Sequence, residues 1–460
     1  MIDVEKRGTP TVALTARHFV EDAHISAEIL GLSALPLAVV PETFTNSSAD
    51  RIHRMVGEAL DQIEAALTRA PLPREPKRQK PAERLALEGE DPLDCVERFN
   101  VLFVAEGWSD GLPLVPPTPR AVERMVAACR LAPDAVVVKG LYPGLGVATI
   151  QKIAINGVMA GCRPEHMPVL IAMVRAYEGL GVAGKIQAMS TGPNAPVVLI
   201  SGPVIRQLGF NNATCVAGPG SPSHVNTVVG RALRLILMNI GQNYPGVMDM
   251  DTIGTANKYS FCLAENAERS PWEPWNVLQG FDRETSTCSI ALVYPGPDLY
   301  DFTAVRAEEL LNTLATLTGS YIGVAGVGRW LYGGWQDPET KKRIKERNVV
   351  LLAPAHAALF AQDGLSRTEA QQALHQKSRI PFRQLFSTTV RPLGPALLQA
   401  HPELSWLLDQ PDTLVGTAET PDCYEYFVTG GDAGRSQFLF AGSDVSTVPI
   451  DVCGDVRSPE

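Results

Sequence analysis

The chain has 460 residues, of which 45% are apolar and 20% are charged, and its formal net charge is −10. A chain of this size and composition can bury a large core without disulfide staples. The acidic balance excludes a global basic surface for nucleic acid, and no uninterrupted apolar run is long enough for a membrane span. The N-terminal sequence MIDVEKRGTP lacks a signal-peptide core. We therefore expect a cytoplasmic enzyme of mixed α/β class.

Residues 1–69 are predicted to form a small βαβα unit. The segments PTVALTA and ALPLAVVP are apolar and β-branched, as strands are, and each precedes a helical pattern. Ser47 or Ser48 is placed to cap the second helix. Strands joined by helical crossovers favour parallel pairing. So short a unit has few strands, and we expect it to dock onto another part of the molecule.

A linker and one large domain are predicted to follow. Residues 70–91 are rich in proline and charge, which is typical of a linker. Residues 92–460 alternate helical patterns with apolar strands and show no internal repeat, so we expect one large mixed α/β domain, with a division into two lobes as the alternative. The pattern predicts helices at 92–106, 118–130, 148–160, 164–178, 222–241, 303–318, 355–363 and 366–376, and strands at 134–139, 196–202, 258–264, 286–294, 321–326, 348–353, 424–429 and 437–441.

Three of the eight cysteines are candidates for chemistry. No two cysteines have the CxxC spacing of a zinc knuckle or a redox motif, so reduced thiols are expected. Cys162, Cys215 and Cys262 each adjoin turn or polar residues. Cys215 precedes the helix expected at 222–241, and the positive end of a helix dipole activates a thiol. The alternative for each is a buried, inert thiol.

The segment KYSFCLAENAERSPWEPW, residues 258–275, brings acid–base groups next to a thiol. As a strand, its alternation places Lys258 and Cys262 on the same face. Glu265 follows at once, and a carboxylate beside a lysine and a cysteine suits proton transfer.

Two loops carry groups that would hold an anionic substrate. Each contains a glycine pair before a helical pattern, and free backbone N–H groups at a helix N-terminus favour anions, although such glycine pairs are also ordinary turns. Trp272 lies between prolines in a rigid loop that would wall a pocket or simply pack. The residues expected to contact substrate are Gly144, Gly146, Lys152, Asn212, Gly218, Gly220, Ser221 and Trp272.

Two further segments are rigid or glycine-rich. Residues 107–119, GWSDGLPLVPPTP, contain two glycines and several prolines, which predicts either a structural tie or a wall of the active site around Asp110. Residues 430–435, GGDAGR, lie between two predicted strands and favour a hairpin.

A resemblance to a bacterial family associated with UGSC-type proteins is carried by the runs WSDGLPLVPPT, KIAINGVMAGCRPE, GPGSPSHVNTVVGRALRLILMNIG, KYSFCLAENAERSPWEPW and GGDAGR. The UGSC family takes its name from a selenocysteine-or-cysteine–Gly–Ser–Cys motif and is regarded as thiol-redox-like. Residues 10–69 look like the C-terminal part of a UGSC-like domain, but the chain contains no CGSC sequence. The resemblance implies sulfur chemistry without supplying the redox motif itself.

The leading hypothesis is an enzyme that acts on a small polar or anionic molecule by cysteine-based chemistry, as an oxidoreductase or a lyase. Cys215 or Cys262 would be the nucleophile, and Lys258 and Glu265 would move protons. This hypothesis requires no cofactor. It also requires that the thiols, which lie far apart in the chain, line a common cleft.

Two alternatives remain open from the sequence. In the first, Cys162, Cys215 and Cys262 ligate a metal or an iron–sulfur centre in a lyase or hydratase. In the second, the chain is a non-catalytic partner of a UGSC-type protein. We expect a homo-oligomer that contacts neither nucleic acid nor membrane.

Overall fold

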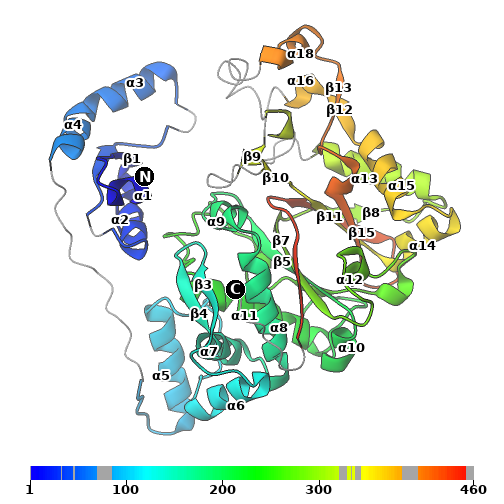
Figure 1. Ribbon diagram of the computed structural model, residues 1–460, viewed down its shortest axis with the longest axis horizontal. Coiled ribbons are helices and arrows are strands. Elements are labelled where there is room, and N and C mark those ends of the chain that lie inside the picture. Colours follow the sequence, from blue (N-terminus) through cyan, green and yellow to red (C-terminus); the bar gives the residue numbers. More distant parts are fainter. Residues whose placement is uncertain are drawn as a thin grey trace.

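The computed structural model describes residues 2–32, 34–44, 47–69, 85–320, 329–332, 334–336, 343–385 and 402–451. It has the mixed α/β class that was expected, with a small N-terminal unit beside a large body built around one sheet (Figure 1). Within the described ranges, no helix combines the length and the apolarity that crossing a bilayer requires.

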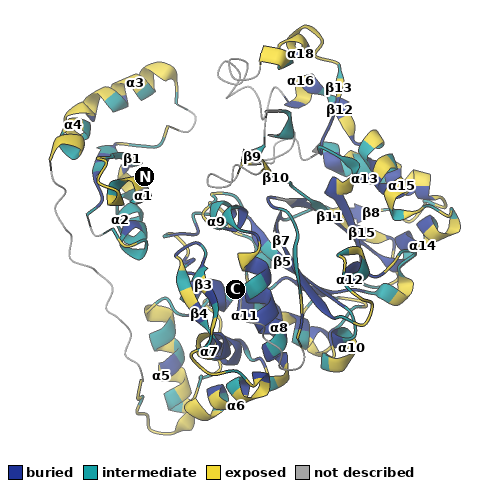
Figure 2. Ribbon diagram, viewed as in Figure 1, coloured by how far each residue is buried: buried dark blue, intermediate teal, exposed yellow. Residues whose placement is uncertain are grey.

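The N-terminal unit is a two-stranded parallel sheet covered by helices. Ala13 of β1 lies opposite Leu37 of β2, as the helical crossover predicted. Ser48 caps the helix α3, where its Oγ accepts a hydrogen bond from the backbone N–H of Arg51. The apolar core of the unit is small, and Figure 2 shows much of its surface as exposed or half-buried. Its elements are α1 (Ile2–Lys6), β1 (Ala13–Ala16), η1 (Arg17–Phe19), α2 (Val20–Ile29), β2 (Leu37–Val40), α3 (Ala49–Glu58) and α4 (Leu60–Thr68).

The predicted linker falls largely outside the described residues, which resume at Leu85. The predicted helices of the body are present within a few residues of their expected bounds. They begin at capping residues that the sequence makes visible, such as Thr118, whose Oγ1 accepts from the N–H of Ala121. The helices of the body are α5 (Pro92–Ala105), α6 (Pro119–Cys129), α7 (Ile150–Ala160), η2 (Pro164–His166), α8 (Met167–Glu178), α9 (Val182–Ala188), α10 (Val204–Leu208), η3 (Ser221–Ser223), α11 (His224–Asn239), η4 (Ala256–Lys258), η5 (Ala267–Arg269), α12 (Trp275–Leu278), α13 (Ala307–Ser320), η6 (Arg329–Tyr332), α14 (Pro354–Gln362), α15 (Arg367–Lys377), α16 (Phe382–Leu385), η9 (Pro402–Leu404), α18 (Trp406–Asp409) and η10 (Pro421–Cys423).

The main sheet has the strand order β14–β11–β15–β7–β5–β6, with β16 beside β7 and β8 beside β15. Three two-stranded sheets lie in the body outside it: β3 with β4, β9 with β10, and β12 with β13. The strands of the body are β3 (Val136–Leu141), β4 (Gly146–Thr149), β5 (Ala195–Ser201), β6 (Cys262–Ala264), β7 (Thr287–Tyr294), β8 (Asp298–Tyr300), β9 (Trp335–Gln336), β10 (Arg343–Ile344), β11 (Asn348–Leu352), β12 (Arg379–Pro381), β13 (Leu414–Gly416), β14 (Tyr424–Val428), β15 (Arg435–Ala441) and β16 (Ser446–Pro449).

The main sheet consists of two halves with the same pattern of pairing. In the first half, β5 pairs in parallel with β6 and antiparallel with β7. In the second half, β11 pairs in parallel with β14 and antiparallel with β15. Glu265 donates its backbone N–H to Ile200, and Thr429 donates its own to Leu352 at the corresponding place. The two halves thus share their strand pairing and register, although the sequence shows no internal repeat.

The halves meet between β7 and β15 and exchange their next strands. Val293 and Ala441 lie opposite each other there, at corresponding positions of the two halves. The strand β8, which follows β7 in the chain, pairs with β15, whereas β16, which follows β15, pairs with β7. This reciprocal exchange gives the sheet an approximate two-fold symmetry.

The edge strands β6 and β14 approach each other at their C-terminal ends. Asn266 donates its backbone N–H to the carbonyl of Val428 over 2.8 Å. The Oγ1 of Thr429 donates to the carbonyl of Ala264 over 2.7 Å. The sheet is therefore curled, and its inner face encloses a core of its own. The helices α7, α8 and α11 cover the outer face of the first half, and α13, α14 and α15 cover that of the second (Figure 1).

Three local expectations need correction. The strands on either side of GGDAGR do not form a hairpin, because β14 and β15 pair with opposite edges of β11. The strand expected at 258–264 is shorter, since Lys258 ends the turn η4 and only Cys262–Ala264 pair with β5. The strand expected at 321–326 lies outside the described residues.

Candidate active site

A cavity with a volume of about 880 Å³ lies beside the N-terminal end of β6. That is a size typical of small-molecule sites. Its walls come from the loop before α6, the C-terminal half of α11 and the loop that joins α11 to β6. They mix charged groups with apolar side chains such as Met238 and Ile253, the latter 91% exposed.

Lys258 is fixed in this wall by two carboxylates. The turn η4 is capped by Thr255, whose Oγ1 accepts from the N–H of Asn257, and it ends at Lys258. The Nζ of Lys258 lies 2.7 Å from Oδ1 of Asp249 and 2.7 Å from Oδ2 of Asp251. The lysine side chain is 14% exposed and each aspartate side chain is 6% exposed. The three charges therefore form a largely buried ion-pair network with one edge on the cavity.

The charges around Lys258 respond to burial and to each other. Burial lowers the pKa of Arg234, against the attraction of Asp249, whose Oδ2 lies 3.4 Å from Nη2 of Arg234. Burial raises the pKa of Asp251, but hydrogen bonds from Lys258 and from backbone N–H groups of the loop outweigh it, so that this pKa lies below its usual value. Asp251 therefore stays ionised at neutral pH and holds the ammonium of Lys258 in position.

A second charged pair fixes the opposite wall. Arg231 of α11 donates through Nε and Nη2 to the two carboxylate oxygens of Asp110, over 2.7 and 2.9 Å. The same guanidinium also donates to the carbonyls of Leu112 and Pro113. A bidentate pair of this kind sets the position of a loop. This segment is therefore a structural tie, and its residues Ser109 and Asp110 line the cavity.

The N-terminal unit reaches the rim of the cavity through α2. The Oγ of Ser26 donates to the carbonyl of Val247, a residue of the cavity wall, over 3.0 Å. The side chain of Ile29 packs against Gly144 closely enough that a Cβ there would lie 2.9 Å from its Cγ2. The expected docking of this unit is therefore observed, at the edge of the cavity.

The cysteines do not line a common cleft. Cys162 and Cys262 are buried in the core against α11, and Cys215 is exposed in a loop at a left-handed φ of 59°. Burial raises the pKa of Cys162 and of Cys262 above the ordinary value of a thiol. The expectation of a shared cleft is wrong, because the side chain of Cys262 points outward from the sheet into apolar packing.

Thiol ligation of a metal also lacks a cluster to support it. Within the part of the chain that the structure describes, no three His, Cys, Asp or Glu side chains gather as a metal site.

Glu265 and Trp272 have structural contacts. Glu265 accepts from the backbone N–H of Trp275 over 2.8 Å and from the Oγ of Ser201, so it fixes the start of α12. Burial raises the pKa of Glu265 above its usual value, although these hydrogen bonds oppose the shift. The indole of Trp272 donates to the carbonyl of Leu365 and packs in the core of the second half.

The predicted anion-binding glycines make close chain contacts instead. Gly146 begins β4, not a helix, and a Cβ at this position would lie 1.8 Å from the carbonyl oxygen of Ile240. Gly144 donates its N–H to the carbonyl of Gly241. Gly218 donates to the carbonyl of Cys215 and closes a turn. These N–H groups are therefore used within the fold.

The other predicted substrate residues lie outside this cavity and outside a second one, of about 450 Å³, in the other half of the sheet. The Nζ of Lys152 donates to the carbonyl of Val147 on the surface, and Asn212 donates to the carbonyl of Glu265. Gly220 and Ser221 lie at the start of η3. Of the residues predicted for catalysis or substrate binding, Lys258 alone lines one of these cavities.

Arg234, Asp249 and Asp251 were not predicted from the sequence as site residues. The closely spaced acids in MDMDT, just before Lys258, were the available signal. Their pairing with α11 depends on the long return of the chain, which no local pattern reveals.

Comparison with known families gives a match for the N-terminal unit. Residues 1–69 match the UGSC family. The match covers the N-terminal unit and does not extend into the body, which bears out the resemblance seen in this segment. No curated protein and no solved structure matches the chain.

Proposed function

We propose that the chain is an enzyme that binds a small polar or anionic molecule in the cavity beside Lys258. The observation that carries this proposal is an ammonium group held by two buried carboxylates at the edge of a cavity of about 880 Å³. A cluster of buried charges costs desolvation free energy, and it is more readily explained by a function than by stability.

The role that fits Lys258 is that of a fixed cation. Its ammonium has three N–H donors. One donates to Oδ1 of Asp249, and the contact of 2.7 Å with Oδ2 of Asp251 is an ion pair. A remaining N–H can donate to an oxygen atom of a ligand and stabilise negative charge that develops on it. The apolar side chains of Met238 and Val247 would contact the carbon skeleton of the same ligand.

Cysteine chemistry, if the enzyme uses it, falls to Cys215. Only the thiolate attacks a substrate, and burial disfavours the thiolate at Cys262. Cys215 is exposed and so remains accessible. The second candidate function is that of a non-catalytic partner of a UGSC-type protein. The contact between the N-terminal unit and the cavity rim favours it.

A local reporter tests ligand binding in this cavity. Ile253 lies on the cavity wall and is highly exposed, so Ile253→Cys in a Cys215→Ser background gives a site for an environment-sensitive fluorophore. The labelled chain is titrated with pyruvate, glycolate, succinate and phosphate. We expect at least one of these anions to change the fluorescence with a saturable Kd, and Lys258→Gln to raise that Kd at least tenfold.

Lys152→Gln is the matched control, because this lysine is exposed and its Nζ bonds to the carbonyl of Val147. It should leave the Kd unchanged. Circular dichroism checks that each variant is folded. The proposal is wrong if none of the anions changes the signal, or if Lys258→Gln binds as tightly as Lys152→Gln.

A further inference from the structure

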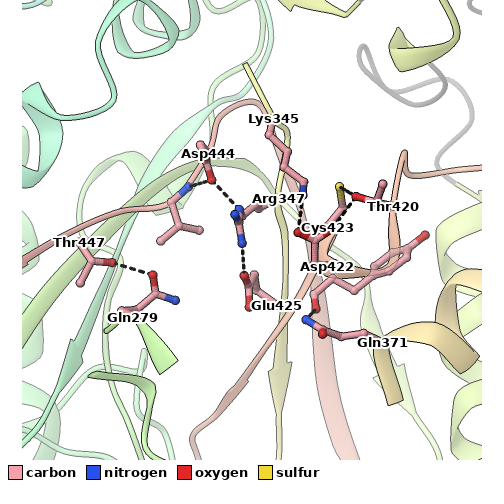
Figure 3. Close-up of polar contacts among 12 residues, drawn as sticks. Gln279, Lys345, Arg347, Gln371, Thr420, Asp422, Cys423, Glu425, Asp444 and Thr447 are labelled. Atoms are coloured by element: carbon pink, nitrogen blue, oxygen red, sulfur yellow. Dashed lines mark hydrogen bonds and ion pairs between the residues drawn. The ribbon is translucent and has the colours of Figure 1, made fainter. Parts of the chain in front are cut away.

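A second cavity opens in the other half of the sheet, near the N-terminal ends of β11 and β14. It has a volume of about 450 Å³ and is lined mainly by polar and charged groups. Figure 3 shows Arg347 between Glu425 and Asp444, with the amides of Gln279 and Gln371 on either side, and all five residues line the cavity. This cavity shares none of its lining residues with the cavity of Lys258.

Glu425 is a buried carboxylate bound by two arginines. Its side chain is 7% exposed, and its Oε1 accepts from Nη1 of Arg347 over 2.6 Å. Its Oε2 accepts from Nη2 of Arg367, whose guanidinium also stacks 5.5 Å from the ring centre of Trp275. The two arginines and the one glutamate leave an excess of one positive charge.

Packing alone does not require these charges. In the second half, Glu425 of β14 lies opposite Val349 of β11. The corresponding residue of the first half is Phe261, whose carbonyl accepts from the N–H of Val198 in the other parallel pair. Phe261 belongs to the inner core of the sheet, so an apolar side chain fills this position in one half. Because apolar residues often replace buried ion networks without loss of stability, the charges in the second half call for another reason.

Asp444 supplies the balancing negative charge from outside. It follows β15 in the chain, is 48% exposed, and places Oδ1 at 2.7 Å from Nε of Arg347. The contact is an ion pair of poor hydrogen-bond geometry: within the described part of the chain, this buried Nε has no properly aligned acceptor. Asp444 thus neutralises the excess positive charge but leaves Nε of Arg347 without a well-aligned acceptor.

We propose that this cavity is a second ligand site, which binds the carboxylate group of a small organic acid in place of Asp444. The planar fork of an arginine matches a carboxylate. Exchange of one carboxylate group for another keeps the arginine fork neutral, whereas a phosphate dianion would place both of its charges on the one group beside Glu425. The Asp444 side chain is about half exposed, so it can turn toward water when the ligand enters, once Oδ1 gives up the hydrogen bond that it accepts from the N–H of Val445.

Calorimetric titration of the full-length chain with succinate tests the site. The titrations use Lys258→Gln, so that the first cavity does not contribute, and are repeated in the wild type. Since Asp444 competes with the ligand, adding Asp444→Asn should lower the Kd for succinate at least threefold. Adding Arg347→Lys, which keeps the charge but loses the fork, should raise it at least tenfold. Phosphate should bind at least tenfold more weakly than succinate.

Asp412→Asn is the matched control, because Asp412 is an exposed aspartate paired with Arg383 on the surface. It removes the same charge at a distance and should leave the Kd unchanged. The proposal is overturned if Asp444→Asn binds succinate no more tightly than Asp412→Asn, if Arg347→Lys binds it as tightly as its parent, or if phosphate binds as well. The binding proposed beside Lys258 is unaffected by these outcomes, because its reporter and its decisive variant lie in the other cavity.

Discussion

Val293 and Ala441 lie opposite each other where β7 meets β15, at corresponding positions in the two halves of the sheet. From this pair outward, the pairing of β5, β6 and β7 matches that of β11, β14 and β15. The repeat is useful for function, because a residue that differs between the halves stands out. Glu425 in place of an apolar residue such as Phe261 is one such difference.

The closing contact between the edge strands should carry measurable stability. Thr429→Val removes the hydroxyl that donates to Ala264 and keeps the shape of the side chain. We expect the free energy of unfolding to fall by about 1 to 2 kcal/mol, because a buried carbonyl loses a hydrogen bond. Chemical denaturation measures it. Thr316→Val, on an exposed helical surface, should change stability by less than about 0.5 kcal/mol. Equal effects at both positions would contradict the closure.

Gly146 should tolerate no side chain. In Gly146→Ala, the new Cβ would lie 1.8 Å from the carbonyl oxygen of Ile240, so the backbone must move. We expect a loss of more than about 3 kcal/mol of unfolding free energy, or failure to fold, as for overpacked sites. Gly319→Ala is the control, because its Cβ would meet only a side-chain methyl at 3.5 Å and it lies in α13. It should be neutral or slightly stabilising. Similar midpoints of thermal unfolding for the two variants would contradict the close contact between Gly146 and the carbonyl of Ile240.

Glu265 should make stability depend on pH in a definite direction. Burial raises its pKa in the folded state above the ordinary 4.5, so ionising it opposes folding. Its favourable contribution is therefore complete below 4.5 and is lost as the pH rises through the raised pKa. Glu265→Gln cannot ionise, and its amide oxygen can still accept from the N–H of Trp275, while its amide nitrogen takes the place of the oxygen that accepts from Ser201. The stability of this variant relative to the wild type should increase as the pH rises from 4 to 8. Glu268→Gln, at an exposed position, should show no such trend, and a relative stability of Glu265→Gln that stays flat or falls would contradict the account.

The cysteines should differ in how readily they are alkylated in the folded chain. Iodoacetamide at neutral pH should modify Cys215 in the folded chain, since this thiol is exposed. Cys162, Cys262 and Cys288 are buried and should react only after denaturation. Peptide mass spectrometry before and after unfolding gives the order, and Cys215→Ser should remove the early product. Modification of Cys262 as fast as that of Cys215 would show that the core around it opens.

Most local structure could be predicted from the residues. Ser48 and Thr118 cap helices at the expected places because a hydroxyl at an N-cap is a local requirement. The parallel pairing of β1 and β2 followed from the helix between them. Pairing partners in the body were not predictable in this way. The strands β14 and β15 adjoin in the chain, yet β11 separates them, and only the global fold decides that.

The candidate sites were harder to predict, for the same reason. Lys258 was found because it stands beside other polar groups in the chain. Arg347, Glu425 and Asp444 are far apart in the sequence and meet only after the strands have been ordered. The thiols led to a wrong prediction of a shared cleft, because a cysteine near turn residues in the sequence can still point into the core, as Cys262 does.

The exchange of β8 and β16 has a consequence for how the chain came about and how it can be divided. Each half completes its sheet with a strand borrowed from the other, so neither is a self-sufficient piece. Two such pieces on separate chains would form an intertwined homodimer, and joining them end to end would give the present arrangement. In a joined chain the two halves need not be identical, so one can carry buried charges where the other has apolar side chains.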